Sequence, residues 1–359
     1  MKSIEIILKI FLLKLLLFFR PVRKKSALPD FNSQSNILFI RLNRIGDAII
    51  TTPLIRAIKE KCQCKIHVLA DVKNHFIYER NPNIEKVHIY KKGLAGFIEL
   101  NRIIRKNKID AIIDLHDDIS TTVSFLVAFA DIKYKLALEK SNSAIYSHTV
   151  ERLDSSQYHI VDRILNLKNL FASKEDNSEY RLEFYPLDKE NQTAQEYFKK
   201  INPDKKLLLG INISAGSKAR FWGVDNFRML CKLLSGYNLT TVLFSTDNDL
   251  NLAKQIIDEN NIYPITKCFG IFAAGIMQLD FLITPDTSAV HIASVKQIPV
   301  FGLYVNYNTS DVIWSPYKTD FEYAVTTEPT LKNITFEEVK QKLIPFLEKY
   351  LNGKQNSEL

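Results

Sequence analysis

The sequence predicts an α/β protein made of two Rossmann-like halves. Short apolar runs alternate along the chain with amphipathic helical stretches, and this alternation occurs twice, with a polar interval between the two rounds. Strands that alternate with helices are typical of a parallel sheet covered on both faces. The chain has 359 residues, of which 46% are hydrophobic, and this is more than one compact core usually holds. We therefore expect two domains of ordinary size.

The first half begins after a polar linker at 26–36. An apolar run at 37–41 predicts the first strand, a turn follows at 43–46, and the pattern then becomes helical at 48–61. The same pattern repeats further on, with strands expected at 65–70, 86–90 and 109–115 and helices at 94–106 and 119–129.

The alternation weakens at 174–178 and again at 186–204, so we place a domain boundary in this region. A second round follows, with strands expected at 207–213, 239–244, 281–284 and 298–304 and helices at 224–234, 250–259, 287–295 and 336–350. The expected domains are therefore 36–186 and 187–334, followed by a C-terminal helix at 335–352.

The N-terminal segment is apolar from residue 4 to 19, interrupted by Glu5, Lys9 and Lys14, and it ends in a basic cluster at 20–25. It is short for a membrane span, and no small-residue cleavage site follows it, which disfavours a signal peptide. We expect residues 1–25 to form an apolar helix lying on an anionic membrane, where the basic cluster adds Coulomb attraction. A core helix packed on the body is the alternative.

The composition excludes several classes of protein. The formal net charge is +8, but outside 20–25 the basic residues are spread out, so the chain lacks the footprint of a nucleic-acid binder. Its cysteines, Cys62, Cys64, Cys231 and Cys268, are too few and too scattered for a disulfide scaffold or a four-cysteine zinc site. A reducing cytoplasm fits this pattern, and we expect neither a metal nor a cofactor.

Ligands of open parallel sheets bind beyond the carboxyl ends of the strands, so we expect the binding residues in the loops that follow strands. The first runs from Arg41 to Asp47 and opens a helix. Gly46 permits a tight turn, and Asp47 lies at the helix start, where the helix dipole favours a carboxylate. A simple helix cap is the alternative. The loop has one glycine where the dinucleotide fingerprint needs three, which disfavours a nicotinamide enzyme.

The second loop runs from Ile213 to Trp222. Its small residues, the hydroxyl of Ser217 and the cations Lys218 and Arg220 make a reasonable cradle for a diphosphate. The spacing of a Walker loop is missing, so nucleoside triphosphate chemistry is not implied. Solvated surface cations are the alternative.

The third loop begins a helix with Asp286, Thr287 and Ser288, and His291 lies in the first turns of that helix. Together they offer a carboxylate, hydroxyls, free helical N–H groups and a titratable ring at one topological switch point, where the strand order of a parallel sheet reverses. Ordinary helix capping is the alternative.

Four segments in this order resemble glycosyltransferase family 9, the ADP-heptose lipopolysaccharide heptosyltransferases. They are RLNRIGDAIITTP at 41–53, the loop at 215–222, DTSAVHIA at 286–293 and WSP at 314–316. The resemblance covers roughly residues 37–316. It implies the GT-B fold, with two Rossmann-like domains facing a cleft, inversion at the anomeric carbon, and no bound metal.

The resemblance also implies roles for single residues. Asp47 matches the family's proposed general base, Arg220 stands where the family usually has a lysine facing the donor phosphates, and Asp249 matches an acidic residue near the ribose. The residues that we expect to bind the donor are Ser217, Lys218, Arg220, Asp249, Asp286, Thr287, Ser288 and His291.

The implied donor is ADP-heptose, and the implied acceptor is the lipid-linked core oligosaccharide of lipopolysaccharide. This places the expected enzyme in the cytoplasm, peripheral on the inner face of the bacterial inner membrane. We expect Arg44 in the first loop, and His116 and Asp117 after a strand of the first half, on the acceptor side. A family 9 transferase using another nucleotide sugar, such as an N-acetylhexosamine donor, and a non-catalytic nucleotide-sugar binder are the alternatives.

Overall fold

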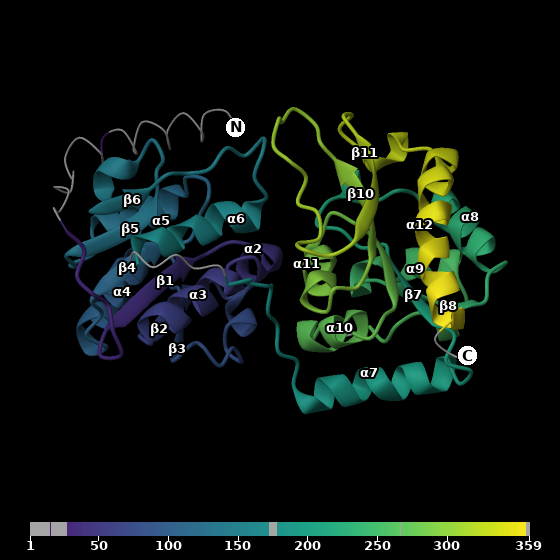
Figure 1. Ribbon diagram of the computed structural model, residues 1–359, viewed down its shortest axis with the longest axis horizontal. Coiled ribbons are helices and arrows are strands. Elements are labelled where there is room, and N and C mark those ends of the chain that lie inside the picture. Colours follow the sequence, from purple (N-terminus) through teal and green to yellow (C-terminus); the bar gives the residue numbers. More distant parts are fainter. Residues whose placement is uncertain (1–14, 16–26, 172–177, 266, 357–359) are drawn as a thin grey trace. The chain divides into compact units, whose positions relative to one another are not determined.

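The computed structural model describes residue 15 and residues 27–171, 178–265 and 267–356. The chain divides into two compact units, unit 1 up to Glu183 and unit 2 from Phe184 (Figure 1). The bounds expected from the sequence, 36–186 and 187–334, stay predictions. Apart from Leu15, the apolar helix expected at 1–25 lies outside the described residues. In the part of the chain that is described, no helix has the length and apolarity needed to cross a membrane.

Unit 1 contains a six-stranded parallel sheet with the strand order β3-β2-β1-β4-β5-β6. Its strands are β1 (Asn36–Arg41), β2 (Lys65–Ala70), β3 (Lys86–Ile89), β4 (Ala111–Asp114), β5 (Tyr134–Leu138) and β6 (His148–Val150). Residues 37–41 of β1 are buried, as expected for a central strand covered on both faces. The chain order reverses direction between β1 and β4, so the crevice beyond their carboxyl ends is the switch point of this sheet.

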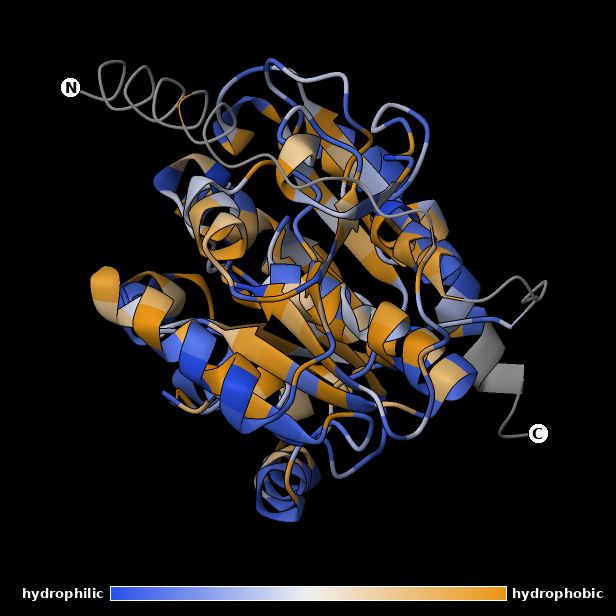
Figure 2. Cartoon of the chain, turned by 90° about the vertical axis from the view of Figure 1, so that its left-hand side faces the viewer, coloured by the Kyte–Doolittle hydropathy of each residue, from blue (hydrophilic) through white to orange (hydrophobic). Residues whose placement is uncertain are grey.

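The main helices of unit 1 are α2 (Ile45–Ile49), α3 (Thr52–Cys62), α4 (Leu94–Lys106), α5 (Thr121–Ala128) and α6 (Ile160–Leu165). The apolar faces of α4 and α5 join side chains of β1 and β4 in one buried cluster, which includes Leu38, Leu100, Ile112 and Leu126. Figure 2 shows the resulting pattern, with hydrophobic residues concentrated on the strands and inner helix faces and hydrophilic residues in the loops.

The helix expected at 48–61 is in fact two helices, α2 and α3. The hydroxyls of Thr51 and Thr52 donate to the carbonyls of Ala48 and Ile49, which competes with continuation of the helix. Pro53 lacks an N–H and so fits near the start of a new helix. The break keeps α2 short, with Asp47 in its first turn.

Two strands of unit 1, β5 and β6, were not predicted. They have 5 and 3 residues, which is too short for a period of two to stand out in the sequence. Pairing in register with β4 and with each other is what makes them strands.

Unit 2 contains a five-stranded parallel sheet with the order β11-β10-β9-β7-β8. Its strands are β7 (Leu207–Asn212), β8 (Leu239–Phe244), β9 (Phe281–Pro285), β10 (Val300–Val305) and β11 (Phe321–Thr326). The chain order reverses between β7 and β9, which is the switch point of this sheet. The edge strand β11 was not predicted, because most of its residues are only partly buried and its apolar pattern is weak.

The main helices of unit 2 are α7 (Asp188–Ile201), α8 (Val224–Leu234), α9 (Leu250–Ile256), α10 (Phe269–Ile276), α11 (Ser288–Val295) and α12 (Phe336–Asn356). The polar interval at 186–204 thus holds a helix of 14 residues, α7, which was not predicted. Only a narrow stripe of α7, including Ala194 and Phe198, is buried, so polar residues obscure its helical period.

Glu190 links the N-terminal end of α7 to the start of α10 by hydrogen bonds. Glu190 accepts a hydrogen bond from the Leu187 N–H at 2.7 Å and another from the Cys268 thiol at 3.1 Å. Its carboxylate occupies the space that Gly270 leaves open, since a Cβ at position 270 would lie 2.2 Å from it. A side chain at position 270 would therefore displace Glu190.

Candidate functional site

The predicted site residues of unit 1 follow β1 and β4, the two strands that flank the switch point. The loop after β1 carries Arg44 and Asp47, and the loop after β4 carries His116 and Asp117. The two loops touch, because the Leu42 N–H lies 3.4 Å from Nε2 of His116. The sheet topology therefore brings these two sequence segments to one edge.

Arg41, the last residue of β1, orients Asp47. The side chain of Arg41 is 2% exposed, and its guanidinium donates to the Leu115 carbonyl and, at 2.6 Å, to Oδ1 of Asp47. Asp47 is 13% exposed, and within the described residues only its Oδ1 has a recorded partner. A buried guanidinium thus fixes the carboxylate while the second oxygen, Oδ2, stays available to a ligand.

Asn74 supports the backbone of the same loop. This buried side chain donates to the carbonyls of Arg41, at 3.3 Å, and Asn43, at 2.9 Å. Its own oxygen accepts from the Asp71 N–H. The loop after β2 therefore holds the loop after β1 in place, and with it the turn that presents Asp47.

Asp114 is the buried centre of a polar network at the end of β4. It accepts from Nδ1 of His116 at 2.7 Å, from the Tyr146 hydroxyl at 2.6 Å and from Nζ of Lys140 at 3.1 Å. Burial acts to raise the pKa of Asp114, but the charge of Lys140 and the neighbouring His116 outweigh it and hold that pKa below its ordinary value. Asp114 is therefore a buried, ionised carboxylate.

His116 connects this network to the loop that carries Asp47. Burial lowers the pKa of His116, although the adjacent Asp114 acts to raise it. A neutral ring with its proton on Nδ1 satisfies both contacts, because Nδ1 then donates to Asp114 and Nε2 accepts from the Leu42 N–H. Both ring nitrogens are thus engaged inside the protein, and the ring positions the loop.

The other two acceptor-side candidates lie in different surroundings. Asp117 is buried, with one carboxylate oxygen 2.8 Å from Arg152 and 3.0 Å from Arg163. Arg44 is exposed, and the structure records no side-chain partner for it within the described residues. Of the three candidates, Arg44 is the one that presents a charged group to solvent.

In unit 2, Asn212 joins the ends of the strands that flank the switch point. Its buried amide donates to the hydroxyl of Thr284 at 3.0 Å and to that of Thr287 at 3.2 Å. Its oxygen accepts from the Ser214 N–H. The diphosphate loop predicted after β7 and the DTSAVHIA segment after β9 are therefore held together by one side chain.

Arg220 and Asp286, both predicted to bind the donor, pair with each other. The guanidinium of Arg220 lies 2.9 Å from Oδ2 of Asp286 and also donates to the Asp286 carbonyl at 2.9 Å. Both side chains are partly exposed, so a ligand can reach the pair. Next to them, Thr287 caps α11 by accepting from the Ala289 N–H, and Ser288 is the first residue of that helix. The capping interpretation of Thr287 therefore holds, alongside any ligand role.

The remaining donor candidates lie in the loops after β7 and β8. Ser217 and Lys218 are exposed, and no side-chain partner is recorded for either within the described residues. Asp249 lies beyond β8 and accepts through Oδ2 from the hydroxyls of Ser214, at 2.6 Å, and Thr246, at 2.9 Å. Its Oδ1 has no recorded partner in the described part of the chain, and the residue is partly exposed.

His291 and Trp222 lie further inside. His291 is 2% exposed on α11, and its ring centroid lies 6.2 Å from that of Trp314, which belongs to the WSP segment. The indole N–H of Trp222 donates to the Ile334 carbonyl at 2.8 Å, and its ring meets Phe227 edge-on. Trp222 therefore anchors the diphosphate loop to the core of unit 2.

The comparison with known families decides the class of protein. The profile of glycosyltransferase family 9 (heptosyltransferase) matches residues 97–344, well over half of the chain. The chain belongs to glycosyltransferase family 9. It is a glycosyltransferase with the GT-B fold, as the sequence predicted. The matched range begins after β3, so Arg44 and Asp47 lie outside it.

Named relatives of this glycosyltransferase are distant. The lipopolysaccharide core heptosyltransferase OpsX of Haemophilus influenzae is 19% identical over 76% of this chain and 80% of that protein. Among solved structures, a family 9 glycosyltransferase from Veillonella parvula has a TM-score of 0.75 and 22% identity, covering 92% of this chain and 100% of that one. The E. coli heptosyltransferase WaaC with ADP has a TM-score of 0.67 and 16% identity, covering 88% and 99%.

Sequence reasoning missed the residues that hold this glycosyltransferase's loops in place. For Arg41 the sequence predicted only a place at the end of a strand and the start of a loop, and it predicted no role for Asn74, Asn212 or Lys140. The available signal was a charged or amide side chain within or just after a buried apolar run, which needs a partner once it is buried. Such a residue can be flagged from the sequence, but its partner cannot be named.

No group of three or more metal-ligating side chains lies together in the described part of this glycosyltransferase. The loop after β7 in unit 2 carries the cations Lys218 and Arg220. The loop after β1 in unit 1 carries Asp47, a carboxylate oriented by Arg41.

Proposed function

We propose that this enzyme transfers heptose from ADP-heptose to the lipopolysaccharide core, with inversion at the anomeric carbon and without a bound metal. Relatives that cover most of the chain are named lipopolysaccharide heptosyltransferases, and a structural neighbour was solved with ADP. The observation that carries the chemistry is the pair Arg41–Asp47, which presents one anchored and one open carboxylate oxygen at the switch point of unit 1.

Asp47 is the general base in this proposal. Its Oδ2 takes the proton from a hydroxyl of the acceptor as that oxygen attacks the anomeric carbon of the donor. The bond from the anomeric carbon to the ADP oxygen breaks in the same step, and its electron pair leaves with ADP. Attack from the face opposite the leaving group inverts the configuration.

Unit 2 binds the donor and stabilises the departing ADP. Arg220 and Lys218 supply positive charge to the diphosphate, and Ser217 and the backbone N–H groups of the loop donate hydrogen bonds. Protein cations thus compensate the charge on the leaving group. Asp249 accepts from ribose hydroxyls through Oδ1 in this proposal.

The residues of the DTSAVHIA segment complete the donor site. Asp286 accepts from sugar hydroxyls while remaining paired to Arg220, and Thr287 and Ser288 offer hydroxyls and helix-start N–H groups. His291 is buried on the same helix and acts in this proposal through the shape of the site.

On the acceptor side, Arg44 faces anionic groups of the core. His116 and Asp117 act indirectly, by holding the loops that carry Arg44 and Asp47. The acceptor is lipid-linked, so the enzyme works on the inner face of the inner membrane, with residues 1–25 as an anchor. We also propose the domain bounds 36–186 and 187–334, with 335–352 as the closing helix.

The test compares Asp47→Asn with the native enzyme in donor binding and in sugar transfer. Asparagine keeps the shape and the hydrogen bond from Arg41 but cannot take a proton, so turnover should fall by about 100-fold or more while ADP-heptose binding stays within about twofold. Asp225→Asn, which changes an exposed carboxylate at the start of α8, is the matched control.

Near-normal turnover of Asp47→Asn would remove Asp47 from the role of base. The identity of the donor is tested separately, by thermal shifts with ADP-, UDP- and GDP-sugars. A shift with a UDP- or GDP-sugar and none with ADP-heptose would overturn the heptosyltransferase proposal.

A further inference from the structure

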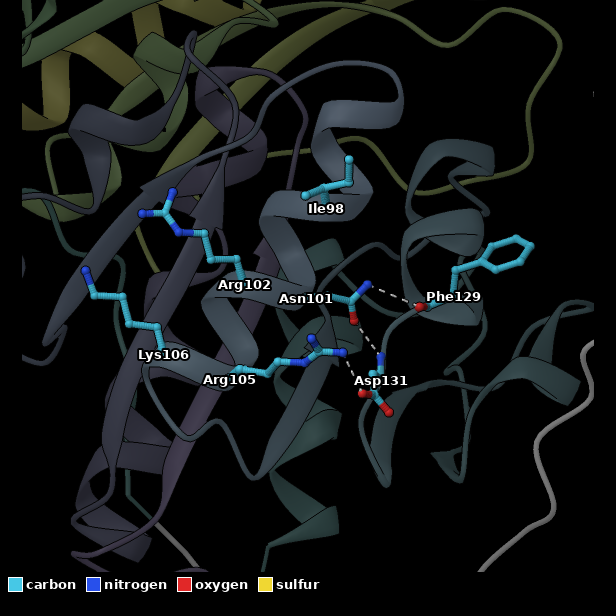
Figure 3. A pocket seen from close by; sticks show the side chains of 7 residues that line it. All are labelled: Ile98, Asn101, Arg102, Arg105, Lys106, Phe129 and Asp131. Atoms are coloured by element: carbon cyan, nitrogen blue, oxygen red, sulfur yellow. Dashed lines mark hydrogen bonds and ion pairs between the residues drawn. The ribbon is translucent and has the colours of Figure 1, made fainter.

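The outer face of α4 in unit 1 carries large apolar side chains that the protein leaves uncovered. Leu94 and Ile98 are 81% and 71% exposed, the highest values among large hydrophobic residues in the described part of the chain. They lie four residues apart and so share one face of the helix. Phe129, also exposed, lies across a hollow from Ile98 (Figure 3).

Leu94 and Ile98 lie within a strongly basic segment. Residues 91–108 contain six lysines and arginines and one acidic residue, Glu99. Lys91 and Arg102 share Glu99, at 3.8 and 3.4 Å. Lys92 and Lys106 are exposed, and no partner is recorded for them within the described residues. Arg105 pairs with Asp131 at 3.2 Å. Two carboxylates therefore neighbour six cations, and the segment keeps a net positive charge.

The exposure does not come from a loosely packed helix. The opposite side of α4 places Leu100, Ile103 and Ile104 in the buried cluster of unit 1. On its flank, Asn101 donates to the Phe129 carbonyl at 3.4 Å and accepts from the Asp131 N–H at 2.7 Å (Figure 3). The helix is thus held firmly, with its apolar tip and its cations directed outward.

We propose that this face, made of Leu94, Ile98, Phe129, Lys92, Arg102 and Lys106, docks on a bilayer surface that carries anionic headgroups. The apolar side chains would enter the boundary between headgroups and acyl chains, and the cations would meet lipid phosphates. A free phosphate would leave the apolar side chains unexplained, and a purely apolar ligand would leave the cations unexplained. The inference deepens the proposed function, because a membrane-borne acceptor requires unit 1 to lie at the membrane.

The first test measures binding of the full chain to phosphatidylethanolamine vesicles with and without phosphatidylglycerol. Leu94→Glu/Ile98→Glu and Lys92→Glu/Lys106→Glu should each weaken binding to the anionic vesicles by about tenfold or more. Lys199→Glu/Lys200→Glu, exposed on α7 of unit 2, makes the same change of net charge as Lys92→Glu/Lys106→Glu and a larger one than Leu94→Glu/Ile98→Glu, and it should have a much smaller effect than either. Unchanged melting temperatures verify that the variants are folded.

A second test measures contact with lipid at one position of α4, so that the result does not depend on residues 1–25. A photo-crosslinking benzophenone side chain at position 98 should attach to vesicle lipid, whereas the same side chain at Met229 on α8 should not. Normal vesicle binding by both charge variants, together with no lipid adduct at position 98, would overturn the inference. An adduct with a second copy of the chain instead of lipid would also overturn it.

The two proposals fail in different ways. If ADP-heptose binds and sugar is transferred to a delipidated core acceptor but position 98 never meets lipid, the docking surface is wrong and the proposed function stands. If position 98 meets lipid but no ADP-sugar binds, the docking surface stands and the function is wrong.

Discussion

The guanidinium of Arg41 lies 2.6 Å from Oδ1 of Asp47, although Arg41 is buried at the end of a central strand and Asp47 follows on a separate helix. The other branch of the guanidinium reaches the Leu115 carbonyl, beyond the neighbouring strand β4. One side chain therefore ties the two strands of the switch point to the carboxylate proposed as the base.

Arg41→Lys should retain the buried charge but lose the two-branched guanidinium that donates to both Asp47 and the Leu115 carbonyl. We expect turnover to fall by about 10-fold or more, with the Kd for ADP-heptose unchanged, because the proposed donor-binding residues are all in unit 2. Steady-state kinetics and donor titration measure the two effects. Equal losses in turnover and donor affinity, or a large fall in melting temperature, would indicate a general structural role instead.

Arg220→Ala should weaken ADP binding by about tenfold or more, because it removes charge proposed to face the diphosphate. Arg220→Lys should restore part of that affinity. Isothermal titration with ADP measures both variants, and Arg228→Ala, on the exposed side of α8, is the control. In a double-mutant cycle with Asp286→Ala, the absence of coupling would contradict the functional pairing of Arg220 with Asp286.

The network around Asp114 should make unit 1 sensitive to acid. The pKa of Asp114 is lowered in the folded state, so the stability it contributes is present above its ordinary value of 3.8 and is lost as pH falls below it. Asp114→Asn should lower the free energy of unfolding by about 3–5 kcal/mol at neutral pH, because it leaves Lys140 buried without its carboxylate.

The same substitution should also flatten the loss of stability on acidification below about pH 4. Urea titrations at several pH values measure both effects, and Asp131→Asn, an exposed carboxylate, is the control. If the stability of Asp114→Asn falls as steeply on acidification as that of the native protein, Asp114 does not cause the acid sensitivity.

His67 and His88 predict a second pH dependence at higher pH. Their rings stack, with Nδ1 of His67 3.2 Å from Nε2 of His88, and burial lowers the pKa of His88 to about 4. An unfolded histidine titrates near 6.5, so the unfolded state binds more protons below that pH. The contribution of His88 to the free energy of unfolding should therefore be fully present above pH 6.5 and decrease as pH falls towards 4.

His88→Gln should reduce this dependence, which we expect to appear as a difference of about 2–4 °C in melting temperature between pH 7 and pH 5. His75→Gln, a substitution of the histidine that pairs with Glu79, is the control. A native-like pH dependence in His88→Gln would assign the effect to other groups.

The sequence by itself determined the twofold α/β alternation, the parallel sheets, the three loops after strands and the family. These features are local, since apolar runs, turn residues and helix caps act on neighbours within a few positions. Short elements escaped prediction for the same reason. The strands β5, β6 and β11 and the polar helix α7 carry too little periodicity and depend on partners distant in the chain.

Only the tertiary structure decided what each loop residue does. Asp47 and His116 looked alike as polar residues after strands, yet Asp47 keeps an open oxygen while both nitrogens of His116 are occupied inside the protein. The difference arises from Arg41 and Leu42, whose partners in the loop after β4 lie 74 residues away. Strand order brings these groups together, and local sequence cannot specify which distant side chain will meet a buried charge.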